Sequence, residues 1–212
     1  MKNSILPLLL VSCMFLLTSC EKETVQVSNS TSAEPVTSMT GVSELVIFHV
    51  SHLDRLTGER TGFVIDRNGQ LKTYQLNAAE SAKLPSNGTW LEEEVAWLFT
   101  TAKTRAHQIG EDDMVEYYNK IRAAATGEYS ERFDNSTENT VHSYHAFTAS
   151  RHTVGSGNCE PGSCSNEATT ITSTMYVSHL LRMEGGAQQV NKQESAIEIV
   201  DWLNGLMIEA GL

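Results

Sequence analysis

Histidine offers the most chemistry in this chain, because an imidazole can bind a metal ion or move a proton near neutral pH. His49 and His52 lie three residues apart near the end of one expected strand, and His142 and His145 have the same spacing in another. Side chains three apart on a strand point to opposite faces, so neither pair can hold one ion alone. We therefore keep His49, His142 and His145 only as candidate ligands of a metal site assembled from separate strands. Otherwise we expect His49 and His145 to be buried and hydrogen-bonded.

The signatures of common catalytic sites are missing from the sequence. Residues 154–158, Val-Gly-Ser-Gly-Asn, do not form the Gly-x-Ser-x-Gly motif of a nucleophile elbow. A glycine-rich phosphate loop, a dinucleotide fingerprint and a His-Glu-x-x-His zinc motif are also missing. We accordingly predict no cofactor, and we interpret the protein as a ligand-binding or assembly-supporting domain rather than an enzyme. The alternatives are a hydrolase and a metal-binding module, each with histidines brought together from separate segments.

The charge of the chain restricts its partners. The formal net charge is −11 at pH 7, whereas nucleic-acid binding requires clustered Lys and Arg. Acidic residues gather at 92–94 and 111–113, each at the start of an expected helix, where the helix dipole favours negative charge. We therefore exclude nucleic acid as a partner and expect a protein or a small molecule instead.

Strands are predicted in the first and last thirds of the folded region. Residues 45–50 form a continuous apolar run, and segments 62–66 and 71–76 follow it on either side of the turn Asn68-Gly69, a strong hairpin signal. This pattern predicts a three-stranded antiparallel meander. Residues 140–151 alternate like a further strand. The stretch 168–183 is ambiguous between strand and helix, and we favour a strand up to Ser178.

Helices are predicted in the middle third and at the end of the chain. Apolar residues recur at helical spacing over 91–106 and again over 112–126, with Gly110 between the two stretches. The short Gly110 link predicts an antiparallel helical hairpin. A last helix should begin near Asn191, where Glu194 completes a capping box, and should end at Gly211. The predicted fold is α+β: an antiparallel sheet packed against a helical hairpin and a C-terminal helix.

The N-terminal residues have the pattern of a targeting signal. Lys2 precedes an apolar run of 13 residues, 5–17, and the tetrapeptide Leu17-Thr18-Ser19-Cys20 follows. The segment resembles a bacterial lipoprotein signal peptide that ends in a lipobox. A plain secretory peptide and a retained membrane anchor are the alternatives, although a spanning helix needs roughly 20 apolar residues.

The resemblance implies that Cys20 carries acyl chains such as palmitate and becomes the first residue of the mature protein. Two or more chains are enough for stable attachment to a bilayer. The protein would then be anchored in the cell envelope, on the outer membrane rather than the inner. Residues 1–19 would be the signal peptide, 20–43 a lipidated and disordered Ser/Thr-rich tether, and 44–212 a single α+β domain.

Two of the four cysteines remain once this signal is assigned. Cys13 lies within the signal peptide and Cys20 is used by the lipid, which leaves Cys159 and Cys164 in an oxidising compartment. We predict that these two form a disulfide across the turn Pro161-Gly162. So short a loop should stabilise the fold by only about 2 kcal/mol. A redox-active pair or two ligands of a zinc site are the alternatives.

Overall fold

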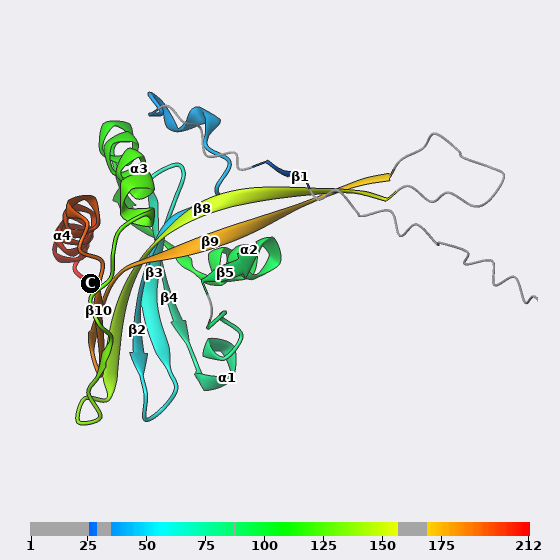
Figure 1. Ribbon diagram of the computed structural model, residues 1–212. Coiled ribbons are helices and arrows are strands. Elements are labelled where there is room, and N and C mark those ends of the chain that lie inside the picture. Colours follow the sequence, from blue (N-terminus) through cyan, green and yellow to red (C-terminus); the bar gives the residue numbers. More distant parts are fainter. Residues whose placement is uncertain (1–25, 29–34, 87, 157–168) are drawn as a thin grey trace, which may run out of the picture.

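An antiparallel sheet forms the centre of the molecule (Figure 1). The computed structural model describes residues 26–28, 35–86, 88–156 and 169–212. Within this part of the chain the ten strands are β1 (Gln26–Ser28), β2 (Val46–Asp54), β3 (Arg60–Asp66), β4 (Gln70–Leu76), β5 (Thr89–Leu91), β6 (Lys103–Gln108), β7 (Phe133–Asp134), β8 (Thr140–Ser156), β9 (Thr169–Gly185) and β10 (Ala187–Val190). Their order is β6-β4-β3-β2-β8-β9-β10-β7, with β1 paired to β8 and β5 paired to β9. The sheet is open.

The predicted meander is confirmed. β2, β3 and β4 pair antiparallel in chain order. The turn between β3 and β4 depends on Gly69, whose φ of +75° suits a residue without a Cβ atom. The buried Asp66 carboxylate accepts hydrogen bonds from the backbone N–H groups of Asn68 and Gln70 and so holds this turn closed. The Asn-Gly signal in the sequence therefore identified the hairpin correctly.

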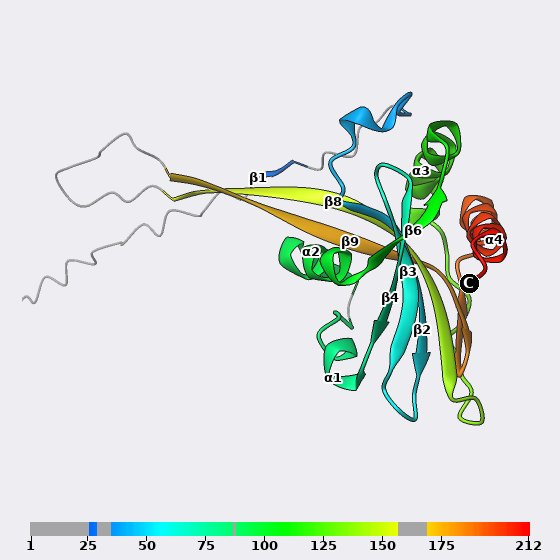
Figure 2. The same ribbon diagram turned by 180° about the vertical axis from the view of Figure 1, so that it is seen from behind.

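The strands β8 and β9 form a long hairpin whose far end projects from the body of the molecule, as both views show (Figures 1 and 2). The short strand β1 pairs with this arm, with Val27 opposite His152. Within the stretch 168–183, ambiguous in the sequence, the described residues from Thr169 onward form a strand, which extends beyond Ser178 to Gly185. Opposite Tyr144 and His145, a register shift in β9 interrupts the alternation of its side chains between the two faces of the sheet. This shift explains why apolar residues of β9 recur in the sequence with a helix-like spacing.

The predicted helix over 91–106 and the helical hairpin need correction. The helix α2 (Glu92–Thr101) ends at Thr101, because β6 follows and pairs with the free edge of β4, with Lys72 opposite Thr104. The next helix, α3 (Glu111–Ala125), begins only after this strand. The two helices lie on opposite faces of the sheet (Figure 1). Pairing at the sheet edge thus overrides the helical period of the sequence over 103–108.

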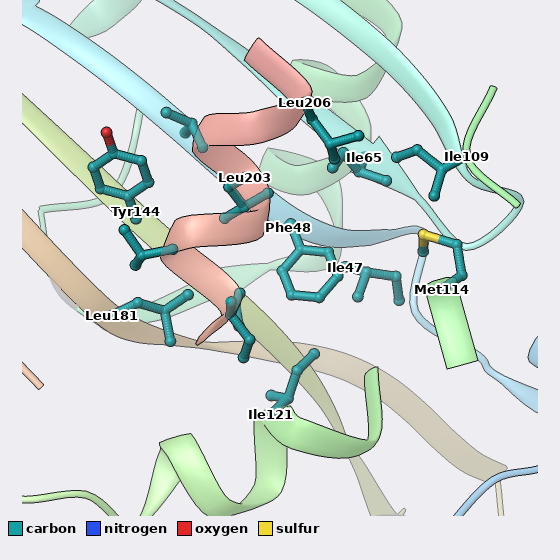
Figure 3. Packing of buried hydrophobic residues seen from close by; sticks show 14 of the residues in the cluster. Ile47, Phe48, Ile65, Ile109, Met114, Ile121, Tyr144, Leu181, Leu203 and Leu206 are labelled. Atoms are coloured by element: carbon teal, nitrogen blue, oxygen red, sulfur yellow. The ribbon is translucent and has the colours of Figure 1, made fainter. Parts of the chain in front are cut away.

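Each face of the sheet has its own hydrophobic core. Phe48 and Ile65 pack on one face against Met114 of α3 and Leu203 of α4 (Glu194–Glu209), as Figure 3 shows. On the other face the core is made by residues of α2, β5 and the sheet that are mostly 0–5% exposed, among them Trp90, Val95, Leu98, Phe147 and Tyr176. The short helix α1 (Ala78–Ser81) lies on this second side. Helices cover the sheet on both sides, and the predicted α+β class with a C-terminal helix is confirmed.

The two ends of the folded region differ in detail from the expectation. Before Glu44, a 3₁₀ turn, η1 (Met39–Gly41), buries Met39 and Val42 in the core, so ordered packing begins earlier than residue 44. At the other end, α4 has Gln193 rather than Asn191 as its N-cap, and the Asn191 side chain accepts from the Gln193 N–H instead. Within the described residues no helix is both long and apolar enough to cross a membrane.

Candidate functional site

The candidate histidines meet as two cross-strand pairs. β2 and β8 are antiparallel neighbours, and their register places His49 opposite His145 and His52 opposite His142. The ring centroids are 5.9 Å apart in the first pair and 3.9 Å apart in the second. As the alternation predicts, His49 and His52 point to opposite faces, so the two pairs lie on opposite sides of the sheet.

The pair His49 and His145 is held by hydroxyl groups. The Nε2 atom of His49 lies 2.6 Å from the Tyr74 hydroxyl, and the Nδ1 atom of His145 lies 2.9 Å from Oγ of Ser178. Burial lowers the pKa of His49 well below its usual value, and the nearby charges of His145 and Arg60 act in the same direction. Burial and the Arg60 charge also lower the pKa of His145, to about 4. Both imidazoles are therefore neutral at pH 7.

The structure does not bring the three candidate metal ligands together. His49 and His145 share one face, while His142 contacts His52 on the other. Within the described residues, no group of three or more His, Cys, Asp or Glu side chains is placed to hold a metal ion. The candidate residues Cys20, Cys159 and Cys164 lie outside the described residues.

A pocket of about 390 Å³ lies on the sheet face that carries His49 and His145. Its floor is made of alternate residues of two neighbouring strands, His49, Ser51 and Leu53 on β2 and Val141, Ser143 and His145 on β8. Pro85, Ser86, Gly88 and Trp90 line one side, and residues of β9 and β10 line another. This volume falls in the usual range for small-molecule sites.

Arg60 brings a positive charge into this pocket. Its Nε donates to Oγ of Ser81 at 3.2 Å and its Nη1 donates to Oγ of Ser51 at 3.3 Å. Ser51 in turn contacts Oγ of Ser143 at 2.8 Å across the two strands. In the part of the chain that the structure describes, Arg60 forms no ion pair with a carboxylate. A half-buried cation held only by neutral hydroxyls can bind an anion.

Two further arginines stand at the rim of the pocket. Arg55 and Arg132 both reach Oδ1 of Asp134, at 3.6 Å and 3.2 Å. These exposed pairs neutralise part of the rim charge, and each contributes little to stability. Arg60 is thus the pocket arginine whose charge a ligand can match most directly.

One atom at the base of the pocket lacks a partner. Nδ1 of His49 is buried and makes no hydrogen bond within the described structure, although His49 itself is only 1% exposed. Buried polar atoms are nearly always paired, so this nitrogen is available to a water molecule or to a ligand group. When the Tyr74 hydroxyl donates to Nε2 of the neutral imidazole rather than to the carbonyl oxygen of Val50, Nδ1 carries the proton and can donate to an anion.

Ser178 and His145 have the contact that a nucleophilic serine and its base would need. A general base works best with a pKa near the operating pH, whereas the pKa of His145 is about 4. Among the described residues no carboxylate binds the second nitrogen of His145 and orients the ring as in a catalytic triad. The arrangement is more suitable for binding a ligand than for activating Ser178.

Sequence reasoning identified the two histidines of this site but not Arg60, Ser51, Ser143 or Ser178. The signal was present as His-x-Ser at 49–51 and Ser-x-His at 143–145, two stretches with strand periodicity. Only the pairing of β2 with β8 places them side by side. Comparison with protein families, characterised proteins and solved structures gave no match to this chain.

Proposed function

We propose that the protein is a lipid-anchored binding protein of the bacterial cell envelope, and that its domain binds a small anionic ligand in the Arg60 pocket. The carrying observation is the Arg60 guanidinium, which is held by Ser51 and Ser81 and has no carboxylate partner among the described residues. A guanidinium presents several N–H donors in a planar fork that matches a carboxylate or a phosphate group.

The charge of the pocket lining supports this proposal, because the lining carries positive side chains whereas the whole chain is negatively charged. The chain has a net charge of −11, yet the pocket lining includes three arginines and no Asp or Glu. Neutral hydroxyl groups accept hydrogen bonds from the Arg60 guanidinium, and no carboxylate among the described residues forms an ion pair that offsets its charge. The partly enclosed site also screens a bound anion less than bulk water does, which strengthens its attraction to Arg60.

Anchoring rests on the lipobox and is a separate part of the proposal. Acylation of Cys20 would keep the pocket close to a bilayer, where it can take up a ligand from the envelope. Binding and anchoring are tested separately, because each can hold without the other.

A nuclear magnetic resonance titration with acetate tests the binding part. Acetate presents a carboxylate and one methyl group, and we expect saturable shifts of the Arg60 Nε–H signal and the His49 ring signals. Arg60→Gln should abolish these shifts. Arg132→Gln, which removes a rim arginine already paired with Asp134, is the matched control and should retain them. Shifts that persist in Arg60→Gln, or shifts absent from the unmodified chain, would contradict the proposal.

A hydrolase is the second candidate, because Ser178 lies 2.9 Å from His145. A fluorophosphonate probe, which labels activated serines, should leave the mass of the intact protein unchanged if Ser178 only binds. Labelling that disappears in Ser178→Ala but persists in Ser143→Ala would establish the hydrolase in place of the binding protein.

A further inference from the structure

The Arg60 pocket is divided into a polar and an apolar half. The polar half is formed by Arg60 of β3, Ser51 of β2 and Ser143 of β8, and the apolar half by Leu180 and Met183 of β9 with Ala187 beside them. The strand register sets this division: Ser143 is paired with Met183, and His145 with Leu180. A single step from β8 to β9 thus leads from the polar side chains of Ser143 and His145 to the aliphatic side chains of Met183 and Leu180.

The apolar half retains surface that a ligand can cover. Leu180 and Met183 are only half-buried, although both line the pocket. Leu53 and Val141, paired across β2 and β8, continue this apolar surface along the floor. Water in contact with such a wall is displaced favourably by an apolar group, by roughly 25 cal/mol for each Å² removed from water.

The register shift in β9 creates this apolar half. Without it, the strict alternation of a strand would place Leu180 and Met183 on opposite faces, because they are three residues apart. The shift opposite Tyr144 and His145 brings both side chains to the pocket and leaves Leu181 in the core of the other face. Bulges of this kind frequently aim side chains at binding sites.

The size of the pocket limits the apolar part of the ligand. A volume of about 390 Å³ corresponds to roughly a dozen water molecules in the liquid. A charged head group at Arg60 therefore leaves space for a short chain or a single ring.

We infer that the ligand is a small single-chain amphiphile, with its carboxylate or phosphate at Arg60 and its hydrocarbon part along Leu180 and Met183. This inference rests on the proposed function, because it assigns the other half of the same pocket. The polar half fixes the head, and the apolar half provides the selectivity for chain length.

Titration calorimetry with octanoate and acetate tests the inference. Each buried methylene should tighten binding about fourfold, so burial of about half of the octanoate chain should give an affinity at least roughly 50-fold above that of acetate. Arg60→Gln should weaken both ligands. Met183→Gln should weaken octanoate about fivefold or more and leave acetate unchanged. Met207→Gln, a change of the same shape on α4 at the opposite face, is the matched control and should affect neither.

The outcomes separate the two proposals. Equal affinities for octanoate and acetate, both dependent on Arg60, would overturn the amphiphile inference and leave the proposed function intact. Octanoate binding that is independent of Arg60 would overturn the placement of the head group. Failure of both ligands to bind would overturn the anion-binding function itself. Octyl phosphate, titrated in parallel, distinguishes a phosphate head from a carboxylate head.

Discussion

His49 and His145 face each other across β2 and β8 with ring centroids 5.9 Å apart, and within the described residues neither ring has a carboxylate partner. Protonation of either ring therefore places a charge in a poorly solvated position near a second imidazole and near Arg60. The folded state resists protonation at both positions. In the unfolded chain the same side chains titrate at their ordinary pKa of about 6.5.

Stability should therefore fall on acidification. Because the folded pKa of His145 is about 4, the unfolded state binds more protons between about pH 6.5 and 4, and the free energy of unfolding decreases as the pH falls through this window. Complete protonation of His145 would lower the free energy of unfolding by roughly 3 kcal/mol. Urea unfolding at several pH values measures the slope of the free energy of unfolding against pH. We expect His145→Gln to flatten it, and an unchanged slope in that variant would contradict the assignment.

Two glycine substitutions should have opposite effects. A Cβ atom at Gly62 would clash with the carbonyl oxygen of Val50 and lie 2.7 Å from the Tyr74 hydroxyl, so Gly62→Ala should destabilise the fold by about 1–3 kcal/mol. Gly205 lies within α4 with nothing within 4 Å of such an atom, and Gly205→Ala should stabilise by about 0.5–1 kcal/mol. Thermal unfolding of the two variants compares them directly. Equal shifts would be inconsistent with the packing described here.

Glu44 should be a stabilising residue although its side chain is buried. It is 5% exposed, and its Oε1 accepts from the Ala149 N–H at 3.0 Å and from the Tyr118 hydroxyl at 3.2 Å. Glu44→Leu should cost about 1–3 kcal/mol, and Tyr118→Phe, which removes one of the two donors, about 1 kcal/mol. A double-mutant cycle measured by urea unfolding should give a coupling between them. If the effects of the two substitutions simply added, the hydrogen bond between Glu44 and Tyr118 would contribute nothing to stability.

The pairing of Cys159 with Cys164 remains a prediction from the sequence. Mass spectrometry of the protein isolated from its native host under non-reducing conditions should find the peptides that contain these residues joined. Two free thiols would refute the disulfide. The double variant Cys159→Ser/Cys164→Ser should lose only about 2 kcal/mol of stability, because the closed loop is so short.

Membrane attachment should depend on Cys20. Cys20→Ala is expected to release the domain from the membrane fraction or to prevent its processing, and the mass of the mature protein should lose its acyl chains. Cys13→Ala, within the apolar run, is the matched control and should leave attachment intact. A Cys20→Ala protein that remains membrane-bound with the same lipid mass would rule out the lipobox assignment.

The sequence predicted those elements whose signals are local. The hairpin at Asn68-Gly69 and the amphipathic stripe of α4 require only neighbouring residues, and both were identified. The strand β6 was not, because the segment 103–108 continues a helical pattern and becomes a strand only by pairing with β4. Arg60 gives no local signal either, since a lone arginine at a strand start is most often solvated.

The pairing of β2 with β8 has a consequence for how the protein is made. The contact between Ser51 and Ser143 spans 92 positions of the chain, whereas the meander β2-β3-β4 closes through short turns. Contacts of high sequence separation form late and slowly, because their loop-closure entropy is lost before any pairing is gained. Until β8 has paired with β2, this edge of β2 is open and the pocket is not formed. The proposed binding site therefore forms only after the C-terminal half of the chain has been synthesised, because residues of β8, β9 and β10 line it.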